Sequence, residues 1–386
     1  MACLIRAPVD GPGVVSLTTA ERDLAVRKDA RLAAQLGALK GRWLIGLHHN
    51  WHDYEFQYDP LYDFSMAGED DLVEVSGKAV PLVPLDACNF APECFTPKAG
   101  GEKFWDVLYV ARAVFFKCIP EFFACIKALY ERGERLRVLF VCPVPPEVQA
   151  GKDQTVLDVR KLYEKTFSPA EQDRFTLVAT ELRYPFPFDL ETLAFFYRSS
   201  RVFAHFASDE RRCRVASYAW ASGMPVVAMA PVASLLPPSL RRPPYFFEAK
   251  SFADFPELIL RAVRESATAP DAAAQACFRV AQSAARLDSA LAALAGVRGL
   301  AYRPGQIARG ALDIRLGRHH LKQALNNSVP MELDAFLQYL DSTPAADLAT
   351  LVEAPDPERA IASGQRGGPK DDAPSALGRL WRRFAS

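Results

Sequence analysis

The sequence has no excess of charge of either sign, no long apolar run and no apolar segment at its N-terminus. Its 46 Lys and Arg are matched by 46 Asp and Glu, so no net field would draw the chain to nucleic acid or to an anionic membrane. No stretch reaches the roughly 18 consecutive apolar residues that a membrane-spanning helix needs. The first residues also lack the apolar core of a secretory signal. We therefore expect a cytoplasmic protein without a nucleic-acid partner.

Patterns typical of disulfide frameworks and metal sites are also missing. The eight cysteines include no C-x-x-C pair and no other metal-ligand spacing, and several lie in apolar runs. Buried free thiols in a reducing compartment fit this pattern best. We expect no metal ion and no bound cofactor.

The sequence does have a long alternation of strand and helix patterns. Half of its 386 residues are hydrophobic, which is enough for a sizeable core and for two domains. From about Lys98 to Glu265, short β-rich runs alternate with helical runs, which predicts an α/β fold with a parallel, doubly wound sheet. The expected strands are Lys103–Ala111, Arg137–Cys142, Phe175–Thr180, Arg201–Phe206 and Pro225–Met229, and the expected helices are Pro120–Gly133, Leu157–Phe167, Leu190–Arg198 and Asp209–Ser222.

Changes in composition divide the chain into four regions. Residues 1–95 hold weaker strand patterns, at Arg42–Leu47 and Asp71–Val75, and residues 96–270 hold the regular alternation. Residues 271–363 read as helical, with an Ala-rich part over Asp271–Val297 and a second part over Pro330–Glu353. Residues 364–386 are a linker rich in Gly, Pro and Ser, followed by a short basic tail.

Two cations follow the strand that ends at Ala111. Arg112 and Lys117 lie in the loop at the carboxyl end of this strand, where open α/β sheets bind ligands. A guanidinium can fork onto phosphate oxygens and an ammonium adds a mobile charge, so together with helix N–H groups they can hold a diphosphate without metal. Two solvated loop cations are the simpler alternative.

An acidic turn follows a later strand. Ser208 fits the N-cap of the helix expected over Asp209–Ser222, with Glu210 in its first turn and Gly223 at its end. Acids in a first turn stabilise the helix dipole and need no ligand. A carboxylate at the carboxyl end of a strand is also well placed to bind a sugar hydroxyl.

The order of these pieces resembles the nucleotide-binding half of retaining glycosyltransferases of the glycogen-synthase-like, family-four type. The matching segments, within roughly Lys98 to Glu265, are Arg112 with Lys117, the tyrosine-containing run Leu193–Ser200, Glu210, and Ala221-Ser-Gly-Met-Pro-Val-Val227. The resemblance implies a GT-B-like fold of two Rossmann-like lobes, with a reduced N-terminal lobe and a helical C-terminal extension. It also implies that Arg112 and Lys117 bind the donor diphosphate and that Glu210 holds the donor sugar.

The sequence departs from this family at several positions. Tyr218 stands where the family usually has a second glutamate that contacts the donor ribose, and we place it among the donor-binding residues. Arg211 and Arg212 replace the glycines that usually follow the first glutamate, where they would crowd the donor or add phosphate contacts. The sequence resembles a divergent member of the family.

A cluster of histidines ends a probable strand of the N-terminal region. His48, His49 and His52 lie within five residues of one another. Enzymes of the family carry a histidine after a strand of the acceptor half, facing the donor sugar, and His48 or His49 resembles that residue. Such a histidine can donate to the sugar or orient the acceptor hydroxyl. A metal-binding cluster and a plain polar turn are the alternatives.

The N-terminal region is short for an acceptor lobe of this family. Either the helices of Asp271–Glu353 complete it, or a large acceptor docks on a shallow surface. The segment Asp313–Ser328 is rich in hydrogen-bond donors and is able to reach the same cleft, although a solvated connection is the more common role of such a run.

The last residues, 376–386, place Leu377, Leu380, Trp381 and Phe384 at helical spacing beside three arginines. This pattern is compatible with peripheral contact at the inner face of a membrane, which would suit a lipid-linked acceptor. A helix docked on the protein itself is the alternative.

The resemblance, together with these residues, implies a metal-independent retaining glycosyltransferase with a nucleotide sugar as co-substrate. Arg112 and Lys117 would neutralise the leaving nucleoside diphosphate, Glu210 would hold the sugar, and His48 or His49 would approach from the acceptor side. The acceptor is a glycan, a lipid-linked molecule or a protein. Two alternatives are a non-catalytic glycosyltransferase-like binding module and a nucleotide-sugar epimerase on the same fold.

Overall fold

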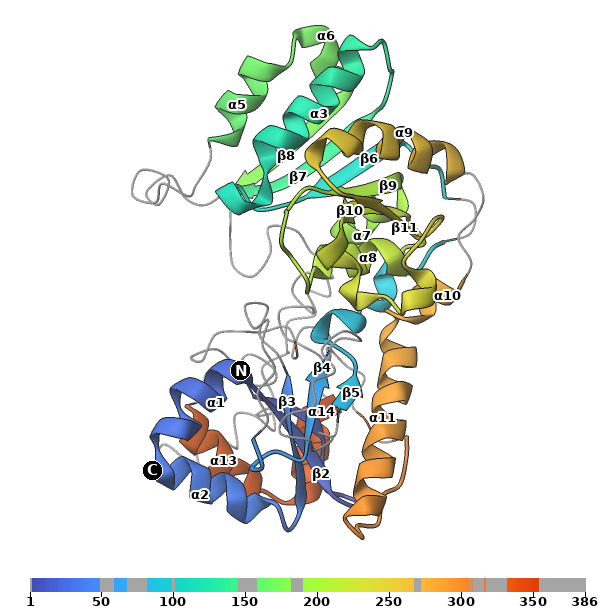
Figure 1. The fold of residues 1–386 in the computed structure, drawn as a ribbon. Helices are drawn as coiled ribbons and strands as arrows, with labels where there is room; N and C mark the ends of the chain where they lie inside the picture. The colour runs from blue at the N-terminus through green and yellow to red at the C-terminus, as the bar shows by residue number, and fades with distance from the viewer. Residues whose placement is uncertain are drawn as a thin grey trace, which may run out of the picture.

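The computed structural model describes most of the chain as two lobes, one above the other in Figure 1. The described residues are 2–48, 59–67, 82–98, 101–144, 158–181, 190–266, 272–305, 307, 316 and 332–353. Four segments named above therefore lie outside the described residues. They are the expected strand at Asp71–Val75, the segment Asp313–Ser328 (except Leu316), the linker 364–375 and the tail at 376–386.

The first lobe contains a mixed five-stranded sheet in the order β1-β2-β3-β4-β5. Its strands are β1 Cys3–Arg6, β2 Gly13–Thr18, β3 Trp43–His48, β4 Phe64–Ala67 and β5 Leu82–Pro84. The pair β1 and β2 is antiparallel, and each later neighbouring pair is parallel. Every residue of β2 and β3 is buried, as expected for strands that are covered on both faces.

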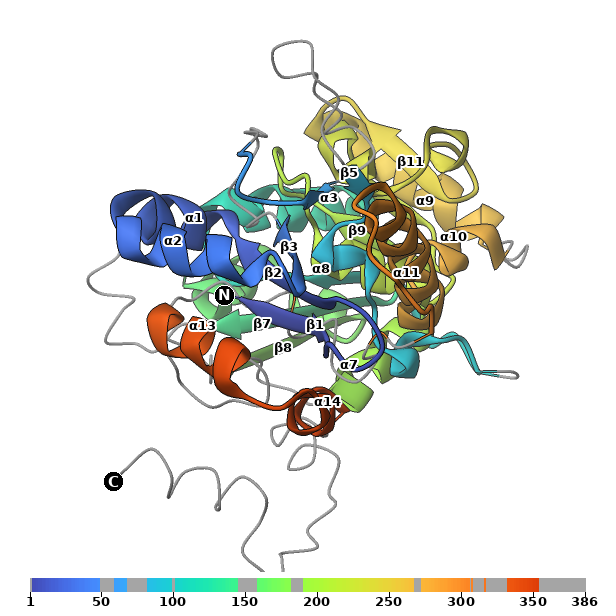
Figure 2. The ribbon, with the colours of Figure 1, turned by 90° about the horizontal axis from the view of Figure 1, so that it is seen from below.

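Helices from both ends of the chain cover this sheet. On one face lie α1 (Thr19–Leu24), α2 (Ala30–Leu39), α13 (Leu333–Ser342) and α14 (Ala345–Glu353). On the other face lies α11 (Val280–Val297), which packs Leu287, Leu291 and Ala295 against Val14 and Leu44, and Figure 2 shows it across the sheet from α1 and α2. The sequence left open whether C-terminal helices complete the short N-terminal lobe or a large acceptor docks on a shallow surface. In the structure, the C-terminal helices pack on this lobe and complete it.

The second lobe has the parallel, doubly wound sheet that the sequence predicts. Its strands are β6 Trp105–Val110, β7 Val138–Val144, β8 Phe175–Glu181, β9 Ser200–His205, β10 Val226–Met229 and β11 Phe246–Ala249. Their order is β11-β10-β9-β6-β7-β8, with all neighbours parallel. This is the 3-2-1-4-5-6 order of Rossmann folds, and it reverses direction between β6 and β9.

Helices cover both faces of the second sheet. The face covered by α3 (Ile119–Glu131), α5 (Val159–Thr166) and α9 (Phe255–Glu265) forms one core, and α7 (Leu190–Arg198) and α8 (Arg214–Ala221) cover the other. The short helices α6 (Pro169–Gln172) and α10 (Ala272–Ala276) lie between larger elements. In α3, Phe122, Ile126 and Leu129 are fully buried on one face, and Gly133 follows with a positive φ of 85°, both as expected.

Two chain segments run side by side between the lobes. Ala91 N–H donates to the Phe278 carbonyl at 2.7 Å, and Val280 N–H donates to the Ala91 carbonyl at 3.2 Å. In addition, Arg212 Nε lies 2.9 Å from Asp86 Oδ2, with both side chains buried. The loop after β9 is therefore tied by an ion pair to the segment that leads out of the first lobe.

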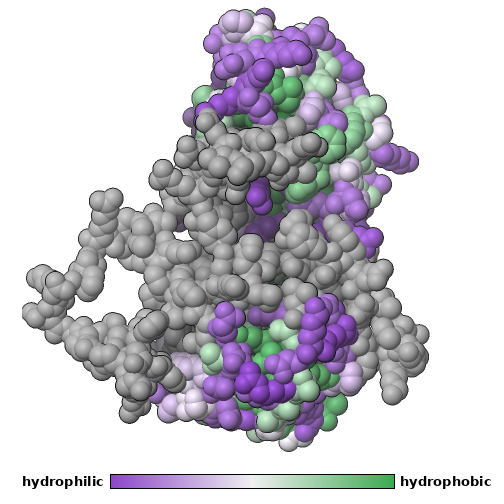
Figure 3. Space-filling model, turned by 90° about the vertical axis from the view of Figure 1, so that its left-hand side faces the viewer, coloured by the Kyte–Doolittle hydropathy of each residue, from purple (hydrophilic) through white to green (hydrophobic). Residues whose placement is uncertain are grey.

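Among the described residues, no helix is both long enough and apolar enough to span a bilayer. On the face shown in Figure 3, hydrophilic side chains cover much of the described surface of both lobes, with smaller hydrophobic areas between them.

Candidate functional site

The candidate site lies where the strand order of the second lobe reverses. Lys117 follows β6 and Glu210 follows β9, and these two strands are hydrogen-bonded neighbours. Their carboxyl ends therefore open at one edge of the sheet, at the topological switch point where ligands of this architecture bind. Lys117 Nζ lies 2.5 Å from Glu210 Oε2, so the structure brings these two predicted site residues together.

Local contacts fix the position of Lys117. It ends the short 3-10 helix Phe115–Lys117, and the Tyr109 hydroxyl donates to its backbone carbonyl at 2.5 Å. The next residue, Cys118, adopts a left-handed φ of 49° and forms the N-cap of α3. The chain therefore turns at Cys118, and the positive N-terminal end of α3 follows Lys117 directly along the chain.

Glu210 lies outside the helix in which the sequence analysis placed it. That helix, α8, begins at Arg214 and not at Asp209, so Ser208 is not its N-cap and Glu210 is not in its first turn. Instead, Glu210 Oε2 accepts hydrogen bonds from Lys117 Nζ at 2.5 Å and from His205 Nε2 at 2.7 Å. The explanation of Glu210 as a helix-dipole acid is therefore wrong.

The charges of this cluster follow from burial and pairing. Burial raises the pKa of the Glu210 carboxyl, but the contacts with His205 and Lys117 outweigh it and hold this pKa at about 2. Burial lowers the pKa of His205, which is fully buried. We therefore take His205 as a neutral ring that donates Nε2–H to an ionised Glu210. Lys117 is the counter-ion of Glu210.

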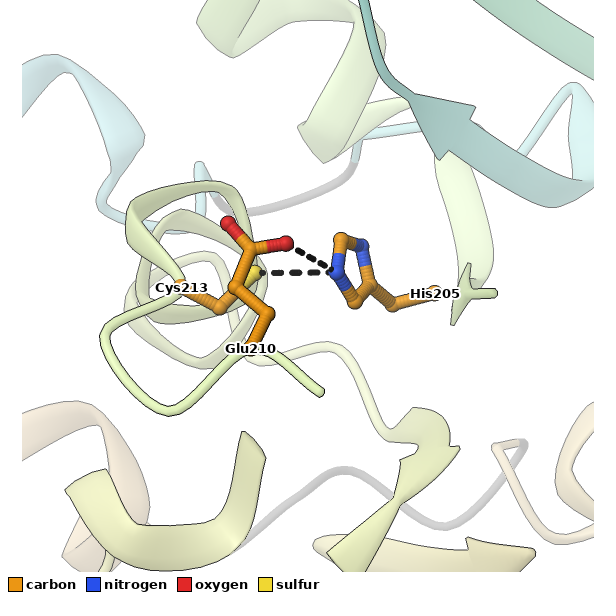
Figure 4. Close-up of side chains that lie close together, drawn as sticks. All are labelled: His205, Glu210 and Cys213. Carbon is orange, nitrogen blue, oxygen red and sulfur yellow. Dashed lines mark hydrogen bonds and ion pairs between the residues drawn. The ribbon is translucent and has the colours of Figure 1, made fainter. Parts of the chain in front are cut away.

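Cys213 completes the cluster from the N-cap position of α8. Figure 4 shows its sulfur and the Glu210 carboxylate approaching the same ring nitrogen of His205, and Sγ lies 3.5 Å from Nε2. Burial raises the pKa of this thiol well above its ordinary value, so the group is protonated in the arrangement described. His205, Glu210 and Cys213 could hold a metal ion, although Lys117 already occupies the carboxylate oxygen that such an ion would take.

Arg112 lies at the same end of β6 as Lys117. It is exposed, and among the described residues no side chain pairs with its guanidinium. The side chains of Phe115 and Phe116, in the same loop, are 68% and 49% exposed, and Lys117 Nζ lies 5.2 Å from the centroid of the Phe116 ring. The loop therefore presents an exposed guanidinium and two exposed aromatic rings, of which Phe116 lies near Lys117.

Tyr218 lies in the core of the second lobe and not at a surface where a ribose could reach it. It is 2% exposed, and its ring stacks on Phe95 with centroids 4.1 Å apart. Tyr218 lies on the face of α8 that packs toward Phe95 and Tyr197. We therefore correct its assignment from donor binding to packing.

The structure describes only one of the two predicted acceptor-side histidines. His48 ends β3, is fully buried, and its Nδ1 is hydrogen-bonded to Ser16 Oγ at 2.8 Å. In this arrangement its ring is part of the first lobe's interior and is not exposed to a ligand. His49 lies outside the described residues.

One side chain of the candidate site, His205, was missed from the sequence. It ends β9, and its position at the carboxyl end of a strand, five residues before Glu210, was a usable signal. Arg212 was expected to crowd the donor or to add phosphate contacts, whereas in the structure it forms the buried ion pair with Asp86. That pairing joins residues far apart in the chain and leaves no local sequence signal.

Comparisons with known proteins show loose structural likeness. No protein-family model matches the chain, and no curated protein sequence matches it. Solved structures similar to it include the GtfA/B complex, at 12% identity and a TM-score of 0.46, with 67% of this chain covered. The chain spans about half of that GtfA/B chain, 54%.

Two further similar structures are enzymes named for sugar phosphates. Sucrose-phosphate synthase from Thermosynechococcus elongatus has 16% identity and a TM-score of 0.45, with 68% of this chain and 72% of that chain covered. The α,α-trehalose 6-phosphate synthase from Burkholderia multivorans has 18% identity and a TM-score of 0.39, with 69% of each chain covered. At these scores the likeness concerns the general arrangement of the chain, and the function is inferred from the site.

Proposed function

We propose that the protein is a retaining glycosyltransferase that uses a nucleotide-diphosphate sugar. The observation that carries this proposal is the position of Lys117, Glu210 and the exposed Arg112 at the switch point between β6 and β9. This edge of a Rossmann-like sheet is where nucleotides bind, and two cations beside a carboxylate suit a ligand with a diphosphate and a sugar.

The cations would act on the leaving group. Breaking the bond between the sugar and its diphosphate places negative charge on the departing phosphate oxygen, and fixed positive groups stabilise that charge. Arg112 supplies a planar fork of donors that no described side chain occupies. Lys117 uses one N–H toward Glu210 and retains two for phosphate oxygens. The N-terminal end of α3 adds positive potential at the same place.

Glu210 would hold the sugar. Its carboxylate has two oxygens, and the contacts of Lys117 and His205 both fall on Oε2. With its pKa held at about 2, the group stays ionised at neutral pH and can accept hydrogen bonds from sugar hydroxyls. His205 and Lys117 fix its orientation, so that little reorganisation is needed when the sugar binds.

The test is turnover with a panel of UDP-, GDP- and ADP-linked sugars, measured as release of nucleoside diphosphate with and without simple glycan acceptors. We expect release from one donor class, and a fall of at least 100-fold in kcat in Glu210→Gln. The matched control is Glu257→Gln on α9, an exposed glutamate that pairs with Arg132, which should retain full turnover. Equal rates in both variants would remove Glu210 from the site.

A non-catalytic binding module is the second candidate. It is favoured by the Lys117–Glu210 ion pair, in which two of the predicted donor-binding side chains neutralise each other, and by the packing role of Tyr218. A protein that binds nucleoside diphosphates but releases none from any donor in the panel would support this candidate. The acceptor, and membrane contact through residues 376–386, stay predictions.

A further inference from the structure

A mixed set of metal-binding atoms lies within the charge cluster of the second lobe. His205 Nε2, a Glu210 carboxylate oxygen and Cys213 Sγ all lie within 4.8 Å of one another (Figure 4). The three residues belong to one short segment that connects the end of β9 to the start of α8. Imidazole nitrogen, carboxylate oxygen and thiolate sulfur together are typical ligands of zinc, whereas magnesium and calcium prefer oxygen alone.

The distances are close to those of a tetrahedral zinc site. With Zn–N bonds of about 2.0 Å and Zn–S bonds of about 2.3 Å, the two ligand atoms lie roughly 3.5 Å apart. His205 Nε2 and Cys213 Sγ are 3.5 Å apart. Glu210 Oε2 lies 2.7 Å from Nε2 and would need to move away from it by roughly half an ångström. This carboxylate is the least buried of the three groups and has room to move.

Lys117 and a metal ion would compete for the same carboxylate. The ammonium lies 2.5 Å from Glu210 Oε2 and balances its charge. A zinc ion bound by the Glu210 carboxylate and a Cys213 thiolate would form a neutral cluster, and the charge of the displaced Lys117 would pass to solvent or to another anion. The two arrangements therefore exclude one another.

We propose that His205, Glu210 and Cys213 bind a zinc ion that displaces Lys117 from Glu210 and so prevents sugar transfer. On binding, the Cys213 thiol releases its proton to solvent, and the His205 ring carries its proton on Nδ1. This nitrogen has no hydrogen-bond partner among the described residues, which favours a reversibly held ion over a permanent structural one. The metal binding does not depend on the proposed function, whereas the inhibition of sugar transfer rests on the proposed function.

The test is titration of the chelator-treated, reduced protein with Co²⁺, followed by competition with Zn²⁺. We expect one equivalent of Co²⁺ to give a thiolate-to-cobalt absorption band that Zn²⁺ removes. Cys213→Ser should lose this band and bind at least tenfold more weakly. The control is Cys125→Ser, at a buried cysteine of α3 outside the cluster, and this variant should keep both the absorption band and the affinity of the parent. Lys117→Met should bind at least tenfold more tightly, because the competing cation is gone.

Each outcome decides the proposal. Absence of the band in the parent, or its persistence in Cys213→Ser, overturns the site, and unchanged affinity in Lys117→Met overturns the displacement. If Cys213→Ser does not fold, Glu210→Gln serves instead and should weaken binding at least tenfold while keeping the band at saturation. These optical readouts do not depend on sugar transfer. Where turnover is found, Zn²⁺ should abolish it, chelator should restore it, and Cys213→Ser should resist the inhibition.

Discussion

The role assigned to Glu210 differs between the sequence and the structure. The sequence is compatible with two roles for Glu210, an acid in the first turn of a helix and a ligand-binding carboxylate, because the residue stands at the start of a helical pattern. The structure starts α8 at Arg214 and directs Glu210 to Lys117 and His205. Just before α8, Cys213 is buried and Arg212 forms an ion pair with Asp86, and neither feature leaves a local sequence pattern.

The first prediction concerns the pH dependence that Glu210 gives to stability. Its pKa in the folded protein, about 2, lies below the ordinary value of 4.5, so it contributes stability above pH 4.5 that is lost as the pH falls toward 2. The full contribution is on the order of 3 kcal/mol. Urea denaturation of the parent and of Glu210→Gln should therefore differ most at pH 7, and the difference should shrink steadily on acidification to pH 3. A difference that stays constant over this range would mean that the carboxylate is not held by Lys117 and His205.

At the scale of elements, the loop that carries Glu210 is anchored to the other lobe. Asp86 caps a short 3-10 helix, Ala87–Asn89, through its contact with the Cys88 N–H, while its second oxygen faces Arg212. Both side chains are almost fully buried. Removing one charge would therefore leave the other in the interior without this ion pair.

The second prediction is a strong coupling between these two residues. Arg212→Met and Asp86→Asn should each lower the free energy of unfolding by about 3 kcal/mol, and the double variant should lose much less than their sum. Asn is chosen because its oxygen can still accept from Cys88. As a control, Arg132→Met breaks the exposed pair with Glu257 and should cost less than about 1 kcal/mol. Additive losses in the double-mutant cycle would show that the pair does not join the lobes energetically.

The third prediction concerns the close packing of β3 and β4. A Cβ at Gly46 of β3 would lie 2.2 Å from the ring of Phe64, so Gly46→Ala should destabilise the first lobe by about 1–3 kcal/mol. Gly37, in α2, has open space around it, and Gly37→Ala should raise stability by up to about 1 kcal/mol. The measurement is the melting temperature of each variant, Gly46→Ala and Gly37→Ala, relative to the parent. An unchanged melting temperature in Gly46→Ala would contradict the described contact between these strands.

The elements of the second lobe were largely predictable, because each parallel strand is a short apolar run and each helix has one apolar face. The strands β6, β7, β8, β9 and β10 lie within two residues of their expected bounds. Tyr218 could not be placed in the same way, since an aromatic on a half-buried helix is equally compatible with packing and with ligand contact. Its contact with Phe95 comes from a distant part of the chain.

At the scale of the whole molecule, the first lobe is assembled from both ends of the chain. The helices α11, α13 and α14 follow the second lobe in sequence but pack on the sheet formed by the first residues. Sequence patterns indicate that these helices exist but do not identify the surface that they cover. The short N-terminal region was the one signal that the lobe needed a further part.

The central claim is that the switch point between β6 and β9 binds a nucleoside diphosphate without a metal. It is tested most directly by calorimetric titration of UDP, GDP and ADP into the parent, Arg112→Ala and Lys117→Ala, all with chelator present. We expect the parent to bind one of the three, and each variant to bind it 10- to 100-fold more weakly, because a charge-assisted contact is lost.

The control in this titration is Arg135→Ala, an exposed arginine just before β7, at the opposite end of the sheet, which should bind like the parent. The account predicts that only the two variants at the carboxyl end of β6 lose affinity. Failure of the parent to bind any of the three diphosphates, or equal affinity in Arg112→Ala, Lys117→Ala and Arg135→Ala, would contradict it.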